Sequence, residues 1–210
     1  MLHIMLKIEK LSLSFGDFNV LNDITLQVSR GELVCLCGES GCGKSSLLKA
    51  IQGFVDTDGR IEVGGKRLDD NTIDAIRRIT AYIPQDLSLP YDSVEKLVTS
   101  LFELRVNRNI NFSTEMLFSD WALLGLDSSL WNKKTNEISG GQRQRIMLSI
   151  AGLTGKSLIL ADEPTSALDT ESSLLVAKYF RMLTSERNMA ILTTSHSERF
   201  AQECDKIIKL

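Results

Sequence analysis

Proline, glycine and cysteine are scarce in this sequence, and long hydrophobic runs are missing. The 210 residues include only 3 prolines and 14 glycines, so neither a low-complexity segment nor a disordered tail is expected. Four cysteines are too few for a disulfide framework in a chain of this length, which favours a reducing cytoplasm. No segment reaches the roughly 18 consecutive apolar residues that span a bilayer. We therefore expect a soluble chain that reaches a membrane only through another protein.

An excess of basic charge is missing as well. The sequence has 24 Lys and Arg against 27 Asp and Glu, a formal net charge of −3. Proteins that neutralise a phosphate backbone usually present a basic face, so nucleic acid is not expected as a partner. The hydrophobic fraction of 43% is enough for the core of one domain of this length, but the chain is too short for two full domains.

Segments with the period of a strand alternate with segments with the period of a helix. Residues 6–15 and 24–28 alternate apolar and polar side chains and are separated by polar residues, which predicts antiparallel strands near the N-terminus. Short continuous apolar runs predict strands buried on both faces. Further strands are predicted at 33–37, 60–63, 79–83, 158–161, 190–194 and 206–210, and helices at 47–54, 139–153 and 171–187. This alternation predicts an α/β fold with a mainly parallel sheet.

A helical insertion is predicted between two of these strands. From Val94 to about Leu126 the apolar residues recur at helical spacing, and no strand-like run occurs. We therefore assign residues 86–138 to an inserted α-helical subdomain within a single domain that spans residues 1–210.

One glycine-rich segment matches a phosphate-binding loop at every fixed position. Gly38-Glu39-Ser40-Gly41-Cys42-Gly43-Lys44-Ser45 fits G-x-x-x-x-G-K-[ST] and lies between a buried strand and a helix. Glycines let backbone N–H groups close around phosphate oxygens, and the helix directs its positive end toward them. Lys44 can then reach the outer phosphates, and Ser45 can hold Mg²⁺. The alternative, a glycine-rich turn with a chance lysine, is disfavoured by the strand and helix on either side.

Two adjacent carboxylates end an apolar strand later in the chain. Residues 157–161 lead directly into Asp162 and Glu163, so the strand tip carries Asp162 toward the magnesium shell and leaves Glu163 free to orient a water molecule. Acids at this place, before Pro164, are equally typical of simple helix caps. A phosphate loop earlier in the same chain favours the catalytic interpretation.

The segment Ser139-Gly140-Gly141-Gln142 has the pattern of a capping box, with Ser139 as the N-cap and Gln142 three residues later. The simpler interpretation is that this segment only begins a helix. Two glycines at a helix N-terminus also make a second anion-binding surface. One chain cannot easily use both phosphate sites on one nucleotide, so the pair of sites implies that two chains act together.

Together these motifs resemble the ATP-binding cassette (ABC) ATPases. The match comprises the phosphate loop, Gln85 after a strand, the signature 139–145, the acidic strand 158–163, Ser166-Ala167-Leu168-Asp169, and His196 after the strand 190–194. These elements follow the order of the family and cover almost the whole chain. The resemblance implies one nucleotide-binding domain, residues 1–210, with a P-loop NTPase core, an N-terminal antiparallel β-subdomain and the helical subdomain at 86–138.

The resemblance also implies a role for each matching residue. Phe15 occupies the position whose ring stacks on adenine, although an aromatic residue in the core of the first strand is the alternative. Gln85, Ser45 and Asp162 look like the magnesium site, and Glu163 looks like the catalytic base, with Lys44, Gln85 and His196 as the other catalytic groups. The nucleotide-binding set is Phe15, Gly38, Glu39, Ser40, Gly41, Cys42, Gly43, Lys44, Ser45 and Ser46. The signature residues Ser139, Gly140, Gly141 and Gln142 of one chain would close on ATP held by the other chain, with Asp169 at the dimer interface.

The cysteines add one expectation. Cys35 and Cys37 lie on a predicted buried strand, where free cysteine behaves as a small hydrophobe, so a metal cluster with Cys42 is not expected. Cys42 lies in the phosphate loop near a helix N-terminus, where a thiol can be alkylated.

The leading hypothesis is an ATPase whose two copies close around two ATP molecules with Mg²⁺. The resemblance couples this motion to integral membrane permease subunits that move a solute, which places the chain in the cytoplasm at the inner face of the cell membrane. The dimer would form with a second copy or a related cassette. The alternative is a soluble cassette ATPase that serves as an ATP-gated assembly or scaffold subunit without a membrane partner. DNA-repair cassettes and nucleotide kinases fit less well, because the chain has no second cassette and does have the signature segment.

The aromatic side chains of the helical subdomain allow two interpretations. Trp121, Trp131 and Tyr91 are typical of a small core, which is the simpler interpretation for each ring. With residues 87–90 they could instead form the surface on which a cytoplasmic helix of the membrane partner docks.

Overall fold

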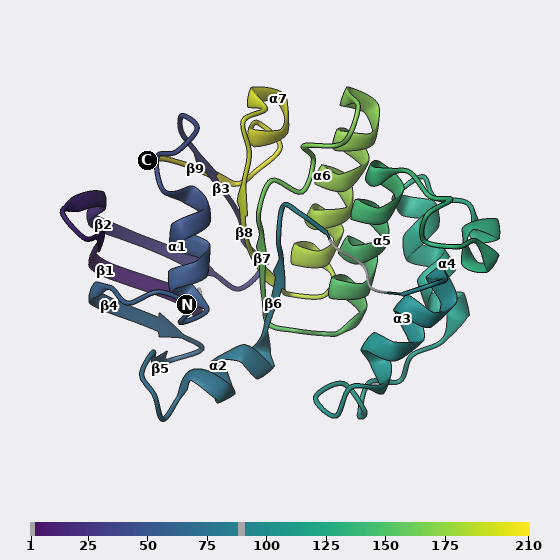
Figure 1. Ribbon diagram of the computed structural model, residues 1–210, viewed down its shortest axis with the longest axis horizontal. Helices are drawn as coiled ribbons and strands as arrows, with labels where there is room; N and C mark the ends of the chain where they lie inside the picture. The colour runs from purple at the N-terminus through teal and green to yellow at the C-terminus, as the bar shows by residue number, and fades with distance from the viewer. Residues whose placement is uncertain (1–2, 88–90) are drawn as a thin grey trace.

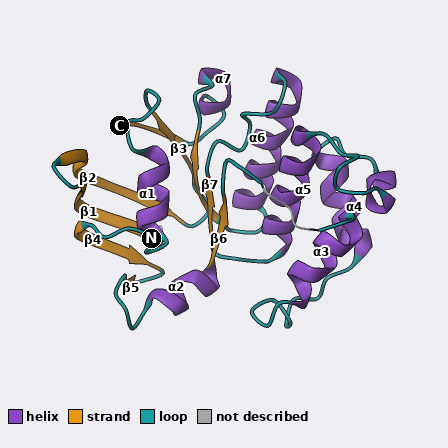
Figure 2. Ribbon diagram, viewed as in Figure 1, coloured by secondary structure: helices purple, strands orange, loops and turns teal. Residues whose placement is uncertain are grey.

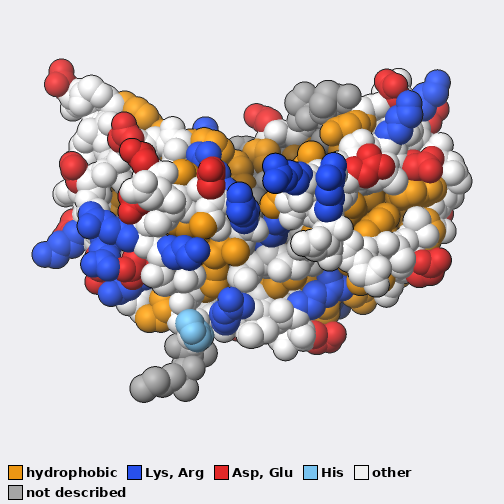
Figure 3. Space-filling model, turned by 90° about the horizontal axis from the view of Figure 1, so that it is seen from below, with side chains coloured by type: hydrophobic (Ala, Val, Ile, Leu, Met, Phe, Trp, Pro, Cys, Tyr) orange, Lys and Arg blue, Asp and Glu red, His pale blue; other side chains and the backbone are white. Residues whose placement is uncertain are grey.

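A computed structural model describes residues 3–87 and 91–210 of the chain. A four-stranded sheet lies at one end, a five-stranded sheet crosses the middle, and most of the helices pack on the far side of the second sheet (Figure 1). Within the described residues, no helix has both the length and the apolar character needed to cross a membrane. On the face seen from below, Lys and Arg side chains are interspersed with Asp and Glu side chains and with apolar ones (Figure 3).

The four-stranded sheet is antiparallel and has the strand order β2-β1-β4-β5. The N-terminal antiparallel sheet expected from the alternating pattern is therefore confirmed. The second strand begins earlier than the pattern predicted, because a tight turn at residues 16–17 pairs Phe15 directly with Phe18. Asp23 lies inside that strand at a shift of register, with a positive φ of 52°. The strands are β1 (Ile4–Phe15), β2 (Phe18–Ser29), β4 (Asp58–Val63) and β5 (Lys66–Arg67).

The five-stranded sheet is parallel throughout and has the order β6-β7-β8-β3-β9. This confirms the parallel α/β core. Because all strands run in one direction, their carboxyl ends meet at one edge, where loops can assemble a site. The strands are β3 (Leu33–Cys37), β6 (Thr80–Ile83), β7 (Leu158–Ala161), β8 (Ala190–Thr194) and β9 (Lys206–Lys209).

Helices cover both faces of this sheet (Figure 2). Helix α1 packs between the two sheets, and helices α5 and α6 lie on the opposite face. The short helices α2 and α7 were not predicted from the sequence, because neither has more than two turns of periodic pattern. The helices are α1 (Lys44–Ile51), α2 (Ile73–Ile79), α3 (Val94–Glu103), α4 (Thr114–Leu123), α5 (Gly140–Leu153), α6 (Thr170–Ser185) and α7 (Glu198–Ala201), with the 3-10 helix η1 (Ser128–Asn132).

The parallel strands are apolar on both faces because each face belongs to a different core. In β3, Leu33 and Cys35 pack toward the helices α3–α6, while Val34 and Leu36 pack toward α1 and the antiparallel sheet. Fully buried side chains on successive residues explain why this strand reads as a continuous apolar run.

Helix α4 is joined to the core by buried polar contacts. Trp121 is fully buried, and its Nε1 donates to Ser149 Oγ at 3.0 Å. The neighbouring Asp120 is 2% exposed and accepts hydrogen bonds from Tyr179 Oη at 2.6 Å and from Arg187 Nη1 at 2.9 Å. Burial, together with the Asp120 carboxylate, raises the pKa of Tyr179 well above its usual value.

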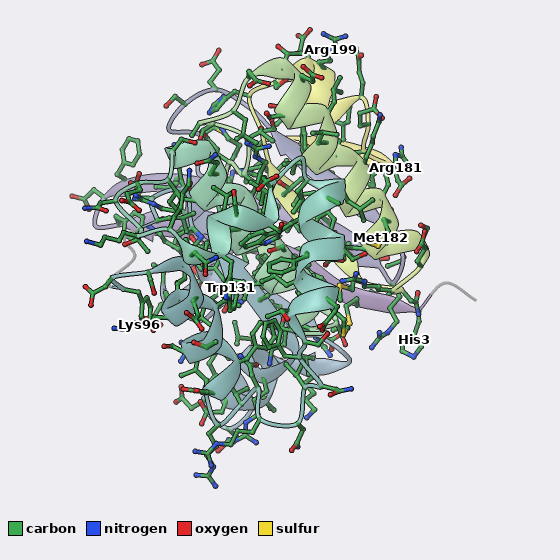
Figure 4. All side chains as sticks on the ribbon, turned by 90° about the vertical axis from the view of Figure 1, so that its right-hand side faces the viewer. His3, Lys96, Trp131, Arg181, Met182 and Arg199 are labelled. Carbon is green, nitrogen blue, oxygen red and sulfur yellow. The ribbon has the colours of Figure 1, made fainter. Side chains whose placement is uncertain are left out.

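The aromatic side chains of this region belong to its core. Trp121 is inaccessible, and Trp131 and Tyr91 are partly buried against the same core. Trp131 packs edge-on against Phe118, on the side of the molecule that faces the viewer in Figure 4. The core interpretation therefore holds for these rings, while residues 88–90 of the suggested docking surface lie outside the described part of the chain.

Candidate functional site

The glycine-rich loop leaves β3, wraps around the Lys44 ammonium group and enters α1. Lys44 is only 5% exposed, and its Nζ donates to the carbonyl oxygens of Gly38 and Glu39 at 2.9 Å each. Gly43 has a φ of 96°, and a Cβ built there would lie 2.7 Å from Leu21 Cδ2. This position therefore requires glycine for both its backbone conformation and its packing.

Helix α1 presents free backbone donors to this loop. Its N-cap, Gly43, has no side chain and makes no side-chain cap, so the first N–H groups of the helix have no side-chain acceptor. Such an end attracts anions through its N–H groups and its dipole. The buried Lys44 ammonium adds a full positive charge at the same place.

Residues from four separate segments line one pocket of about 280 Å³ at the carboxyl ends of the parallel strands. The glycine loop supplies one wall, and three side chains that follow β6, β7 and β8 supply the other. The lining residues are Ser40, Gly41, Gly43, Lys44, Ser45, Ser46, Gln85, Glu163 and His196. The four side chains expected to be catalytic, Lys44, Gln85, Glu163 and His196, therefore line the same pocket.

The Glu163 carboxylate lies between two polar side chains in this pocket. His196 Nε2 lies 2.7 Å from Oε1, and Gln85 Nε2 donates to Oε2 at 3.2 Å. The Glu163 side chain is 18% exposed, whereas His196 is 44% exposed. Each oxygen of the Glu163 carboxylate therefore has a polar neighbour, and the side chain remains partly accessible from the pocket.

Asp162 is placed differently from its neighbour. It is buried and does not line the pocket, and its N–H donates to the carbonyl of Ile83 at 2.9 Å. Burial, together with the charge of Asp162, raises the pKa of Tyr82 to about 12. No α-helix follows until α6, whose N-cap is Asp169, so the interpretation of these two acids as simple helix caps is wrong.

Sequence reasoning missed two side chains that contact the Glu163 backbone, Thr194 and Gln144. Thr194 Oγ1 accepts a hydrogen bond from Glu163 N at 2.8 Å, and Gln144 Nε2 donates to Glu163 O at 3.0 Å. A signal existed for the first of them, because Thr193 and Thr194 are polar residues at the end of a strand that is buried at every position. Gln144 belongs to the signature segment 139–145, but nothing in that pattern indicated a contact with the Glu163 backbone.

The segment Ser139–Gln142 does form the expected capping box. Ser139 Oγ accepts from Gln142 N at 3.1 Å, and Gln142 Oε1 accepts from Ser139 N at 2.9 Å. A Cβ on Gly141 would lie 2.7 Å from Leu168 Cδ2 and 3.0 Å from Ala167 O, so this helix start packs tightly against residues 167–168. None of the four residues lines the Lys44 pocket of the same chain.

Asp169 and Phe15 both lie at the surface. Asp169 caps α6 by accepting from Ser172 N at 2.7 Å, and this hydrogen bond lowers the pKa of its carboxyl group. Phe15 is 53% exposed at the β1–β2 turn, so the alternative of a core aromatic is wrong. Its ring does not line the Lys44 pocket.

The cysteines of β3 and the loop differ in their surroundings. Cys35 is buried, and its Sγ lies 3.6 Å from Cys37 Sγ. Cys42 is half-buried, and Lys44 Nζ donates a hydrogen bond to its Sγ at 3.7 Å. In residues 3–87 and 91–210, no group of three or more His, Cys, Asp or Glu side chains is placed to hold a metal ion.

The family model and the similar proteins found by comparison all belong to one family. A family model described as "ABC transporter" matches residues 21–166. The sulfate/thiosulfate import ATP-binding protein CysA of Cucumis sativus is 32% identical over 209 residues, which cover 97% of this chain and 59% of that protein. The phosphonates import ATP-binding protein PhnC of Fusobacterium nucleatum is 28% identical, with 98% of this chain and 88% of that protein covered. The chain thus spans only about three fifths of some of its relatives.

Solved structures agree with this comparison. A dimeric, post-hydrolysis ATP-binding cassette bound to ADP and Pi superposes with a TM-score of 0.81 at 26% identity, covering 98% of this chain and 94% of that one. A structure described as the ATP-binding subunit of an ABC transporter gives a TM-score of 0.84 at 27% identity, covering 98% and 85% of the two chains.

Proposed function

This chain belongs to the ABC transporter family, and we propose that it binds and hydrolyses ATP in a two-chain assembly that powers solute transport through a separate membrane permease. The observation that carries the proposal is the pocket in which Lys44, at a helix N-terminus, faces Glu163, Gln85 and His196. A cationic phosphate cradle opposite an oriented carboxylate is the arrangement that phosphoryl transfer to water requires.

ATP and Mg²⁺ fit the donor set of this pocket. The α1 amides and the Lys44 ammonium suit a triphosphate. Ser45 and Gln85 line the pocket and offer oxygen ligands, and the buried Asp162 directly precedes the pocket residue Glu163, so these three residues would hold Mg²⁺. When bound, the metal ion supplies charge neutralisation at the outer phosphates. Phe15 presents an exposed ring on which adenine can stack.

Hydrolysis then divides among the side chains of the pocket. Glu163 accepts a proton from the attacking water, because its carboxylate belongs to the lining of the pocket and is held there by Gln85 and His196. His196 fixes the Oε1 oxygen of that carboxylate and, as a residue of the pocket lining, would be available to a γ-phosphate bound there. Lys44 leaves its two backbone acceptors for phosphate oxygens and stabilises their growing charge.

The second chain completes each site in this proposal. The helix N-terminus at residues 139–142 lies outside the Lys44 pocket of its own chain, so Ser139 and Gly141 are available to an ATP molecule held by a partner. Asp169 lies at the surface near this segment and would line the same interface. The post-hydrolysis cassette that resembles this chain is itself dimeric.

The helical part of the chain would connect the site to a permease. Residues 86–138 contain α3, α4 and η1, which share a core with α5 and α6, and we assign them to an inserted subdomain of the single domain 1–210. The relatives are named as parts of import and export systems, which favours transport over the alternative of a soluble assembly subunit. The chain would work at the inner face of the membrane, bound to the permease.

Two measurements test the proposal. Titration calorimetry with ATP and excess Mg²⁺ is expected to show nucleotide uptake, and a phosphate-release assay is expected to show turnover. An absence of uptake would contradict the ATP site itself. For the transport part, the tagged chain is used to capture partners from detergent-solubilised membranes. A polytopic membrane protein is the expected partner, and recovery of soluble partners alone would favour the assembly role.

A further inference from the structure

The backbone of Glu163 adopts a conformation that residues with a Cβ rarely adopt. Its φ is 46°, in the left-handed region, whereas the preceding strand is extended. A non-glycine residue keeps such a conformation only where its surroundings hold it. The peptide at this position therefore needs partners on both its N–H and its C=O.

Thr194 holds the N–H side. Its hydroxyl accepts the Glu163 N–H at 2.8 Å and donates its own hydrogen to Asp162 Oδ1 at 2.9 Å. Only a group that both donates and accepts can bridge an amide and a carboxylate in this way. Thr194 is fully buried at the end of β8, so no solvent competes for either contact.

Gln144 holds the C=O side. It comes from α5, is 2% exposed, and donates from Nε2 to Glu163 O at 3.0 Å. Its Oε1 has no hydrogen-bond partner among the described residues. The hydrogen bond from Nε2 to Glu163 O is therefore the contact that orients the buried amide of Gln144.

We propose that Thr194 and Gln144 are positioning residues that hold the Glu163 peptide in its left-handed conformation and so direct the Glu163 carboxylate toward Gln85 and His196. The inference rests on the proposed function, because it assigns these residues to the hydrolysis step. Relaxation of the peptide to a negative φ would turn the side chain away from the pocket. Neither residue lines the pocket, so neither touches the nucleotide directly: Gln144 acts on the Glu163 peptide, and Thr194 acts on that peptide and on the neighbouring Asp162 carboxylate.

The test compares threonine variants in the full chain by ATP hydrolysis. Thr194→Val keeps the shape of the side chain but loses the bridge, and we expect kcat to fall about 10-fold while KM stays within about 3-fold. Thr194→Ser keeps the hydroxyl and is expected to restore at least about half of kcat. Thr193→Val is the matched control, because the buried Thr193 hydroxyl has one hydrogen-bond partner among the described residues, Thr194 O at 3.4 Å. Its kcat is expected to stay near the wild-type value.

A second variant covers the case in which Thr194→Val does not fold. Gln144→Met keeps the length of the side chain and removes its donor, and we expect the same loss of kcat at nearly constant KM. Thermal unfolding of each variant, with ATP binding measured by calorimetry, separates lost positioning from lost structure.

The outcomes separate the inference from the proposed function. If the wild type hydrolyses ATP and Glu163→Gln does not, but the folded Thr194→Val and Gln144→Met variants keep wild-type kcat, the positioning inference is overturned alone. A loss in Thr194→Val that Thr194→Ser does not restore also overturns it. If the wild type itself shows no hydrolysis, the proposed function fails and the inference falls with it.

Discussion

Replacing Glu163 with Gln removes the carboxylate of the proposed site and keeps its shape. The side chain is 18% exposed and holds one oxygen near His196 and the other near Gln85. A glutamine amide fits the same space but cannot take a proton from water. Loss of a general base lowers rates by about 10² to 10⁴, or roughly 3 to 5 kcal/mol of activation free energy. We therefore expect kcat for phosphate release to fall at least about 100-fold.

Binding is expected to respond in the opposite direction. The variant loses a negative charge from a pocket that also receives a triphosphate, so ATP affinity stays the same or rises. Slow hydrolysis with intact binding leaves the two-chain, ATP-bound state populated, and size-exclusion chromatography with saturating ATP and Mg²⁺ is expected to show a dimer. Glu186→Gln, the same chemical change at an exposed position at the end of α6, is the control and is expected to behave as the wild type.

Two results would refute this reasoning at different points. Hydrolysis by Glu163→Gln within about 3-fold of the wild type, in a chain that stays monomeric with ATP, makes both the base and the two-chain site wrong. If Glu163→Gln loses hydrolysis but forms no dimer with ATP, Glu163 remains the proposed base and the proposal of a site shared by two chains is wrong.

Three further changes probe the loop and the core. Lys44→Ala is expected to weaken ATP binding by at least about 10-fold in calorimetry, because Lys44 supplies the one ammonium group among the described residues that line the pocket; unchanged affinity would contradict the phosphate cradle. Maleimide is expected to modify Cys42 and slow hydrolysis, with protection by ATP, because Cys42 Sγ contacts Lys44 Nζ; unchanged activity after complete modification, verified by mass spectrometry, argues against this. Arg187→Met leaves the buried Asp120 carboxylate without its cation and is expected to lower the free energy of unfolding by about 2 to 4 kcal/mol in urea denaturation; a change below about 0.5 kcal/mol would mean that the pair does not stabilise the attachment of α4.

The sequence predicted the parts of the site that depend on local spacing. The glycine loop requires its glycines at fixed intervals, and Gly43 has both a positive φ and no room for a Cβ. The capping box at Ser139 is likewise a three-residue pattern, and the structure contains both of its hydrogen bonds. The buried strands were visible because both faces of the parallel sheet are covered, so the pattern contains no polar interruptions.

Features that depend on tertiary register were not predictable. Thr194 lies 32 residues from Asp162, and their contact arises only because β7 and β8 pair in parallel with Ala161 opposite Thr193. The exposure of Phe15 depends on a two-residue turn that begins β2 earlier than its polar residues suggested. The two short helices α2 and α7 carry too few turns for a periodic signal.

Helix α5 joins both halves of the proposed mechanism. Its first residues, 139–142, present the surface that a second chain would use, and Gln144, two residues beyond Gln142, contacts the Glu163 peptide of its own chain. The start of α5 packs without spare room against residues 167–168, since a Cβ on Gly141 would meet Ala167 O at 3.0 Å. In the proposed dimer, the helix that presents Ser139 and Gly141 to the partner's nucleotide therefore also carries the side chain that holds the Glu163 peptide of its own chain.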